Sequence, residues 1–110
     1  MSTASIDEYH LPAMMKSVIK KLSARQGVIG VVLVDPDGLT LDTSMDQLQA
    51  EIISGWVQIL ISKAKETAKT VKGAGEIVSM AVEADSKEIL ITPDTEGKFT
   101  IVVLREKEKY

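Results

Sequence analysis

The sequence has no cysteine, a single histidine and no excess of basic residues. Without cysteine there are no disulfides, no thiolate chemistry and no cysteine–zinc sites, which fits a reducing compartment. The formal net charge of −3 argues against a general nucleic-acid-binding protein, because such proteins normally carry a basic excess. The most apolar stretch, residues 52–61, covers only about half a bilayer, and the polar, acidic residues 1–10 do not have the pattern of a signal peptide. We therefore expect a cytoplasmic protein.

Patterns that carry chemistry are also missing. Neither glycine-rich phosphate loop, GxGxxG or GxxxxGK(S/T), occurs in the chain. His10 has no evident Ser or Cys partner that would make it a general base. Asp35, Asp37 and Gly38 resemble the start of a calcium loop, but the third acidic ligand and the terminal Glu are missing, so we interpret this segment as a turn. We predict no catalytic residue, no metal site and no cofactor, and therefore no enzyme.

The clearest structural pattern lies in residues 27–46. Residues 28–34 are wholly apolar and rich in β-branched side chains, which is typical of a strand covered on both faces. The segment Asp35-Pro36-Asp37-Gly38 then predicts a turn. Residues 39–44 alternate, with Leu39, Leu41 and Thr43 on one side, so only one face of this second strand is expected to be buried. A central strand joined by a hairpin to an edge strand indicates an antiparallel sheet.

The remaining patterns complete an α-β-β-α-β-β-β order in a single α+β domain. Apolar periodicity predicts a first helix over residues 11–24 and a long helix over residues 47–71, with Asp46 as N-cap and Gly73 as the residue that ends it. Three further strands are expected at residues 77–84, 89–91 and 99–104. The predicted organisation is a flexible lead at residues 1–10, one domain at residues 11–104 and a charged, solvated tail at residues 105–110.

The long helix has more apolar surface than one sheet face can cover. Its apolar side chains span an arc of about 200°, whereas packing on a sheet needs little more than about 100°. Either the first helix or a loop covers the surplus within the protomer, or a partner does, most simply a second copy. The side chains in this arc are Ile52, Ile53, Trp56, Val57, Ile59, Leu60, Ile61, Ala64 and Ala68.

Two other features suggest contacts with partners. Residues 77–84 have no proline and a mixed face of small side chains, which is compatible with an edge strand that pairs with another chain. Lys16, Lys20, Lys21 and Arg25 form a basic group on or near the first helix. This group is either a solvated face placed favourably near the helix C-terminus, or a docking site for an acidic partner or an anionic membrane.

The order of the elements and the sequences of the turns resemble those of the Roadblock family of dynein light-chain type. The resemblance rests on GVVLVDPDGLTLDTSMD, on the helix ending SKAKETAKTV and on EILITPDTEGKFTIVVL. It implies a five-stranded antiparallel sheet in the order 2-1-5-4-3, with the long helix on one face. It also implies homo- or heterodimers that pair their third strands edge to edge, with the two long helices side by side. Many relatives carry a further C-terminal helix, which we do not expect after the last strand of this sequence. We therefore expect the sheet face that this helix would cover to be covered by the first helix, left open or filled by a partner.

Mapped onto this sequence, the implied dimer interface draws on the long helix and the third strand. Its candidate residues are Ile53, Trp56, Val57, Leu60, Ile61, Ala64, Ile77, Ser79, Ala81 and Glu83. The resemblance implies a non-enzymatic dimeric module that binds or regulates a Ras-like small GTPase, with membranes involved only indirectly. The alternatives are a pure scaffold or adaptor subunit of a larger complex, of dynein or signalling type, and a small-molecule sensor with a pocket between helix and sheet.

Overall fold

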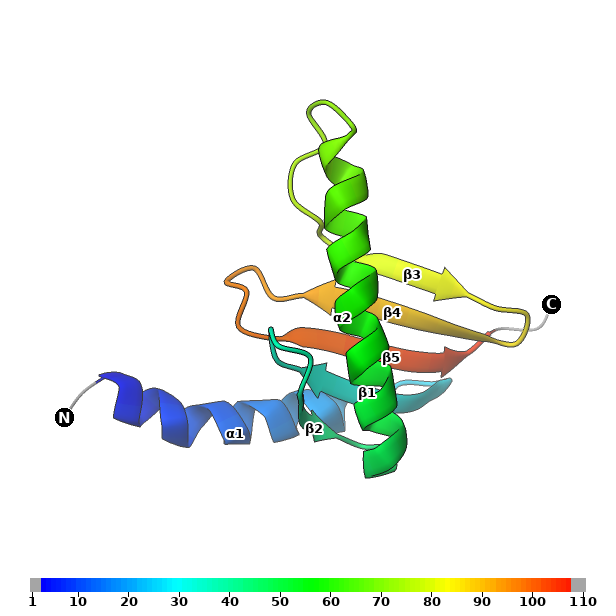
Figure 1. Cartoon of the computed structure of the whole chain (residues 1–110). Helices are drawn as coiled ribbons and strands as arrows, with labels where there is room; N and C mark the ends of the chain where they lie inside the picture. Colours follow the sequence, from blue (N-terminus) through cyan, green and yellow to red (C-terminus); the bar gives the residue numbers. More distant parts are fainter. Residues whose placement is uncertain (1–2, 108–110) are drawn as a thin grey trace.

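The five strands form one antiparallel sheet in the order β2-β1-β5-β4-β3 (Figure 1). This computed structural model describes the backbone of residues 3–107 and the side chains of residues 12–107. The α+β class, the element order and the strand order are those predicted. In chain order the elements are α1 (Thr3–Ser23), β1 (Val28–Val34), β2 (Thr40–Thr43), α2 (Gln47–Lys69), β3 (Met80–Glu83), β4 (Lys87–Pro93) and β5 (Thr100–Glu106).

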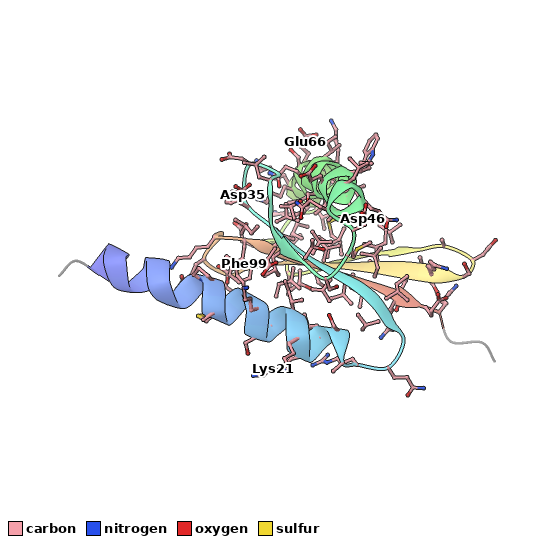
Figure 2. The ribbon with its side chains drawn as sticks, turned by 90° about the horizontal axis from the view of Figure 1, so that it is seen from below. Lys21, Asp35, Asp46, Glu66 and Phe99 are labelled. Atoms are coloured by element: carbon pink, nitrogen blue, oxygen red, sulfur yellow. The ribbon has the colours of Figure 1, made fainter. Side chains whose placement is uncertain are left out.

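The two helices lie on opposite faces of the sheet. Figure 2 shows α2 above the strands and α1 below them. Helix α1 packs on β1 and β2, where its Met15 is buried. The first helix therefore covers part of the face opposite α2, while Leu90, Ile101 and Val103 on that face stay half-buried. Because the sheet separates the helices, α1 does not cover the surplus apolar surface of α2.

Strand β1 is buried on both faces from Gly30 to Val34, as its uninterrupted apolar sequence predicted, whereas Ile29 near its start is exposed. Val32 and Val34 belong to the core cluster beneath α2, and the alternate residues Val31 and Leu33 are buried on the α1 side. The α2-side core is completed by Ala50, Val57, Ile61, Ile91 and Val102.

The DPDG segment is the predicted turn. Oδ1 of Asp35 accepts hydrogen bonds from the backbone N–H groups of Asp37 and Leu39, both at 2.9 Å. Gly38 has a φ of 89°, a left-handed conformation that a residue with a Cβ rarely adopts. The Asp35 carboxylate thus organises its own loop.

Helix α2 begins where the sequence predicted. The side chain of Asp46 caps it by accepting a hydrogen bond from the N–H of Gln49. The helix ends at Lys69, two residues before the predicted end, and the N–H of Thr70 bonds back to the carbonyl of Thr67. Ser54 is fully buried on this helix, yet its hydroxyl contacts both the carbonyl of Ala50 and the Thr40 hydroxyl, so no polar group is stranded there.

Strand β2 differs from the expected pattern. Leu39 and Leu41, predicted on its buried face, are exposed, whereas Thr40 faces α2 and bonds to Ser54. The cause is an irregularity in the β1–β2 pairing between Leu33 and Val34, which shifts the alternation by one residue.

The bounds of the terminal elements also need correction. Helix α1 begins at Thr3 instead of residue 11 and contains Pro12 in its interior, a position where proline disfavours a helix. Backbone residues 3–10 of the predicted flexible lead are therefore helical. Residues 1–2 and 108–110, which fall in the predicted lead and tail, lie outside the described residues.

The last two strands are longer than predicted. Strand β4 begins at Lys87, before the predicted start at residue 89, and β5 runs on to Glu106, through the start of the predicted tail. Lys87 lies opposite Glu106 and bonds to its carboxylate at 3.4 Å. The N–H of Glu106 also bonds to the carbonyl of Gly27 at 2.8 Å. These cross-strand contacts order a charged segment whose composition alone suggested solvation.

Candidate functional site

The predicted interface residues of α2 divide into two groups. Val57 and Ile61 are 2% and 5% exposed and belong to the core cluster against the sheet. Their side chains are therefore used within the protomer and are not available to a partner. Trp56 and Leu60 are 63% and 37% exposed, and with the half-buried Ile53 they form what we call the α2 flank.

Three more apolar side chains of α2 are exposed beside this flank. At about 100° per residue, they point away from the side of the helix that carries Val57 and the core. Ile52 and Ile59 were recognised in the apolar arc but not assigned to the interface, and Leu48 was missed altogether. Leu48 has helical spacing with Ile52 and Ile59, and this spacing could have predicted that it belongs to the same apolar surface. The members of this group, which we call the α2 outer face, are Leu48, Ile52 and Ile59.

No other described segment covers the flank. Helix α1 lies across the sheet (Figure 2). The β1–β2 hairpin approaches α2 on its other side, where Gln58 donates a hydrogen bond from Nε2 to the carbonyl of Pro36 at 2.6 Å. Gln58 and Trp56 are separated by about 200° around the helix. The sequence left open whether the first helix or a loop covers the surplus apolar surface of α2. The first helix does not cover it, and the β1–β2 hairpin does not cover the α2 flank.

Strand β3 supplies an open sheet edge. It is the last strand in the sheet order, so its outer backbone groups have no strand partner within the described chain. Ala81 and Glu83 lie in this strand and are exposed. Ile77 and Ser79, predicted in the same strand, precede it, because β3 begins at Met80 instead of residue 77.

The short β3 has a physical cause. Met80 pairs with Ile91, so continued pairing would set Val78 opposite Pro93, which has no N–H to donate. At the other end of β3, the Glu83 carboxylate forms an ion pair with Lys107, with 2.8 Å between Oε1 and Nζ. The hydrogen bond and the positive charge of Lys107 lower the pKa of Glu83.

The helix and the strand edge meet at one end of the molecule. Figure 1 shows α2 crossing the strands from β2 to β3 and continuing past the β3 edge. Ala64, the last of the predicted interface residues on α2, is half-buried in the C-terminal part of the helix. The structure therefore brings the predicted helical and strand residues onto adjacent surfaces.

The described residues offer little that would serve small-molecule chemistry. Among residues 12–107, whose side chains are described, no group of three or more His, Cys, Asp or Glu side chains could hold a metal ion. The side chain of His10 lies outside the described side chains. A shallow cavity of about 520 Å³ is lined by Gly38, Leu39, Thr40 and Glu51 beside the hairpin, and the space between α2 and the sheet is filled by the core cluster. Within the described part of the chain, no helix is long and apolar enough to cross a membrane.

Comparison with known proteins gives one family and several related folds. The family model described as the Roadblock/LC7 domain matches residues 14–105. A Roadblock/LC7 domain from Streptomyces avermitilis superimposes with a TM-score of 0.75 at 22% identity, covering 82% of this chain and 76% of that one. Myxococcus xanthus MglB gives 0.74 at 16% identity, covering 86% and 76% of the two chains. An MglB described with a tetrameric arrangement gives 0.71 at 13% identity, covering 82% and 68%.

Proposed function

Because the chain belongs to the Roadblock/LC7 domain family, we propose that it is a non-enzymatic interaction module that dimerises through α2 and β3 and binds or regulates a Ras-like small GTPase. The observation that supports this most directly is the exposed α2 flank beside an open β3 edge. An exposed tryptophan and leucine on a regular helix are typical of a surface that a partner covers.

A second copy of the chain fits this pair of surfaces. A two-fold axis can pair an edge strand with itself, because the same surface then serves both protomers. Strand β3 has only four residues, so its backbone hydrogen bonds alone would make a small contact. The α2 flank would add the apolar burial that a stable dimer of about 800 Å² per protomer requires. The part of α2 that continues past β3 would lie over the sheet of the partner. That an MglB is described with a tetrameric arrangement is compatible with such self-association.

The α2 outer face would remain available in this dimer. Leu48 and Ile52 lie toward the N-terminal end of α2. Figure 1 shows this end of the helix by β2 and β1 and away from the β3 edge. Leu48 is 67% exposed, and Glu51 and Asp46 flank the same part of the helix. Apolar side chains rimmed by charges are typical of a transient protein-binding site. We assign the GTPase contact to this outer face.

The experiment separates the two parts of the proposal. The purified chain is incubated with small GTPases of the same organism, each loaded with GDP or a GTP analogue, and binding is measured by pulldown and by nucleotide hydrolysis and exchange. We expect binding to one GTPase that Leu48→Lys weakens by at least about tenfold, whereas Met14→Lys, which changes an exposed apolar residue on the opposite side of the sheet, leaves it unchanged.

Each outcome has a defined meaning. Absence of binding to every GTPase in both nucleotide states refutes the GTPase assignment. Binding without any effect on hydrolysis or exchange indicates a passive platform, the scaffold alternative. The sensor alternative is disfavoured by the filled space between α2 and the sheet, and a ligand-dependent shift in melting temperature would revive it.

A further inference from the structure

Helix α1 and the turn that follows it carry four cations that form no ion pair with a described residue. No acidic residue occurs between Glu8 and Asp35 in the sequence. Among the described residues, the ion pairs involve none of these four side chains, and all four are exposed. On α1 the lysines lie on the half of the helix that faces away from buried Met15. We call this group the basic face; it consists of Lys16, Lys20, Lys21 and Arg25.

Acidic groups on the same side of the sheet are largely matched. Strand alternation and register place Glu83 and Glu88 on the sheet face that α1 covers. Glu83 pairs with Lys107, and Glu88 pairs with Arg105. Among the described strand residues, Asp42, opposite Leu33 in β2, is the remaining carboxylate on this face, and it accepts a hydrogen bond from the N–H of Thr43. Within the described part of the chain, no carboxylate therefore pairs with the basic face.

The opposite side of the molecule carries charges of both signs, since α2 also presents the exposed lysines Lys63, Lys65 and Lys69. Figure 2 shows Lys21 below the sheet, whereas Asp35, Asp46 and Glu66 lie above it with α2. The whole chain has a net charge of −3, so an even distribution of charge would repel an anionic surface. The observed arrangement instead gathers cations without ion pairs on the α1 side, whereas the lysines of α2 lie among carboxylates. An anionic surface would therefore attract the α1 side more strongly.

We propose that the basic face docks the protein peripherally on an anionic lipid bilayer and turns α2 away from the membrane. The shape and chemistry of the face favour a bilayer over an acidic protein. It is the convex outer side of a helix, which suits a broad charged surface. Three of its four cations are lysines, which act as flexible point charges and lack the planar fork with which arginine recognises a shaped carboxylate site. Diffuse attraction of Lys and Arg to anionic headgroups needs neither a pocket nor a fixed geometry.

Docking through the basic face would also fix the orientation of the partner-binding side of the molecule. The α2 outer face, to which we assign partner binding, would point into solution. If the proposed β3-paired dimer forms, its two-fold axis would run perpendicular to the sheet and keep both copies of α1 on one side. The two basic faces would then contact one bilayer together and bind more tightly than either alone. Only this gain in affinity depends on the dimer. The sequence resemblance suggested no more than indirect membrane involvement, so direct contact is an extension of it.

The test uses two pairs of lysines with matched spacing. Lys16→Gln/Lys20→Gln removes two cations four residues apart on the basic face. Lys65→Gln/Lys69→Gln removes two exposed cations with the same spacing on α2. The full chain and both variants are mixed with vesicles of phosphatidylcholine, with or without 30 mol% phosphatidylserine (about one lipid in three, enough to give the surface potential of an anionic leaflet), and bound protein is measured by flotation.

We expect binding only to the anionic vesicles and a steep loss of binding with added salt, because salt screens exposed charges. Each cation near such a surface contributes roughly fivefold to binding, so the α1 variant should bind roughly 25-fold more weakly. The α2 variant should stay within about twofold of the parent chain. Far-ultraviolet circular dichroism and the melting temperature check that both variants fold.

Three results would overturn the proposal. One is no binding of the parent chain to phosphatidylserine vesicles at low salt, and another is equal loss in the two lysine variants. The third is binding to poly-glutamate without binding to vesicles, which would assign the basic face to an acidic protein. A Trp56→Ala variant that is monomeric but still binds vesicles, more weakly and through the same lysines, would uphold this inference independently of the dimer. Failure of GTPase binding would leave it unaffected.

Discussion

Replacing Trp56 by alanine should weaken the dimer, whereas replacing Ile61 by alanine should destabilise the fold of the protomer. Trp56 and Ile61 are five residues apart on α2, and the sequence assigned both to the interface. In the structure Trp56 is 63% exposed, whereas Ile61 is 5% exposed. The two substitutions should therefore affect different measurements.

The size of the Trp56 effect follows from its exposed surface. A tryptophan side chain has up to about 250 Å² to bury, of which about 160 Å² remains for a partner at this exposure. At about 25 cal/mol per Å², complete burial would stabilise the contact by up to about 4 kcal/mol per side chain. Alanine retains part of that contact, and ordering the interface has a cost, so we expect about 2 kcal/mol per Trp56. A two-fold dimer loses this twice, about 4 kcal/mol, or about a thousandfold in its dissociation constant.

Sedimentation equilibrium over a range of concentrations measures this dissociation constant. Trp56→Ala should shift the chain toward monomer, and its melting temperature should then depend less on protein concentration. Ile61→Ala should instead lower the free energy of unfolding by about 2–5 kcal/mol, because it leaves a cavity in the core. Met14→Ala, at an exposed apolar residue of α1, is the control and should change neither quantity. If Trp56→Ala lowers stability as Ile61→Ala does and leaves the mass unchanged, the reasoning from exposure is refuted.

Three further changes test other parts of the structure. Ala81→Lys places a charge on the open β3 edge and should weaken the dimer by about tenfold or more; an unchanged mass in light scattering would mean that β3 is not the interface. Gly30→Ala would put a Cβ 2.5 Å from Cγ and Sδ of Met45, so urea unfolding should show a loss of about 1–3 kcal/mol, and no loss would show that Met45 moves aside freely. Because Lys107 lowers the pKa of Glu83 in the folded state, the stability from this pair is complete above the unfolded pKa of Glu83 and is lost as the pH falls through its lower folded pKa. Glu83→Gln should remove that part of the pH dependence of unfolding, and an NMR titration of the Glu83 carboxyl that gives an ordinary pKa would contradict this.

The candidate site was only partly predictable from sequence. Helical periodicity correctly identified an apolar surplus on α2, and it placed Trp56 and Leu60 within it. Periodicity did not distinguish these from Val57 and Ile61, because all four lie in one continuous apolar arc. Which part of the arc meets the sheet depends on how the helix is rotated about its axis, and that rotation is set by contacts with β1, β4 and β5.

The strand edges show the same limitation. The third strand was predicted to begin at residue 77, but its start is fixed by the register with β4 and by Pro93, sixteen residues further along the chain. Likewise, Leu39 and Leu41 were expected to be buried, and a shift in the pairing with β1 exposes them. Such shifts arise from the partner strand, so the pattern within one strand does not reveal them.

The sequence by itself determined the features that depend on near neighbours along the chain. The apolar run of β1, the Asp35 turn and the Asp46 cap each follow from side chains within a few residues of the backbone they control. The order of elements, with its turn motifs, was sufficient to predict the family. The tertiary structure alone decided that α1 and α2 lie on opposite faces of the sheet. That placement leaves the α2 flank and outer face uncovered on one side and collects unpaired cations on the other, because burial and charge balance depend on residues that are distant in the sequence.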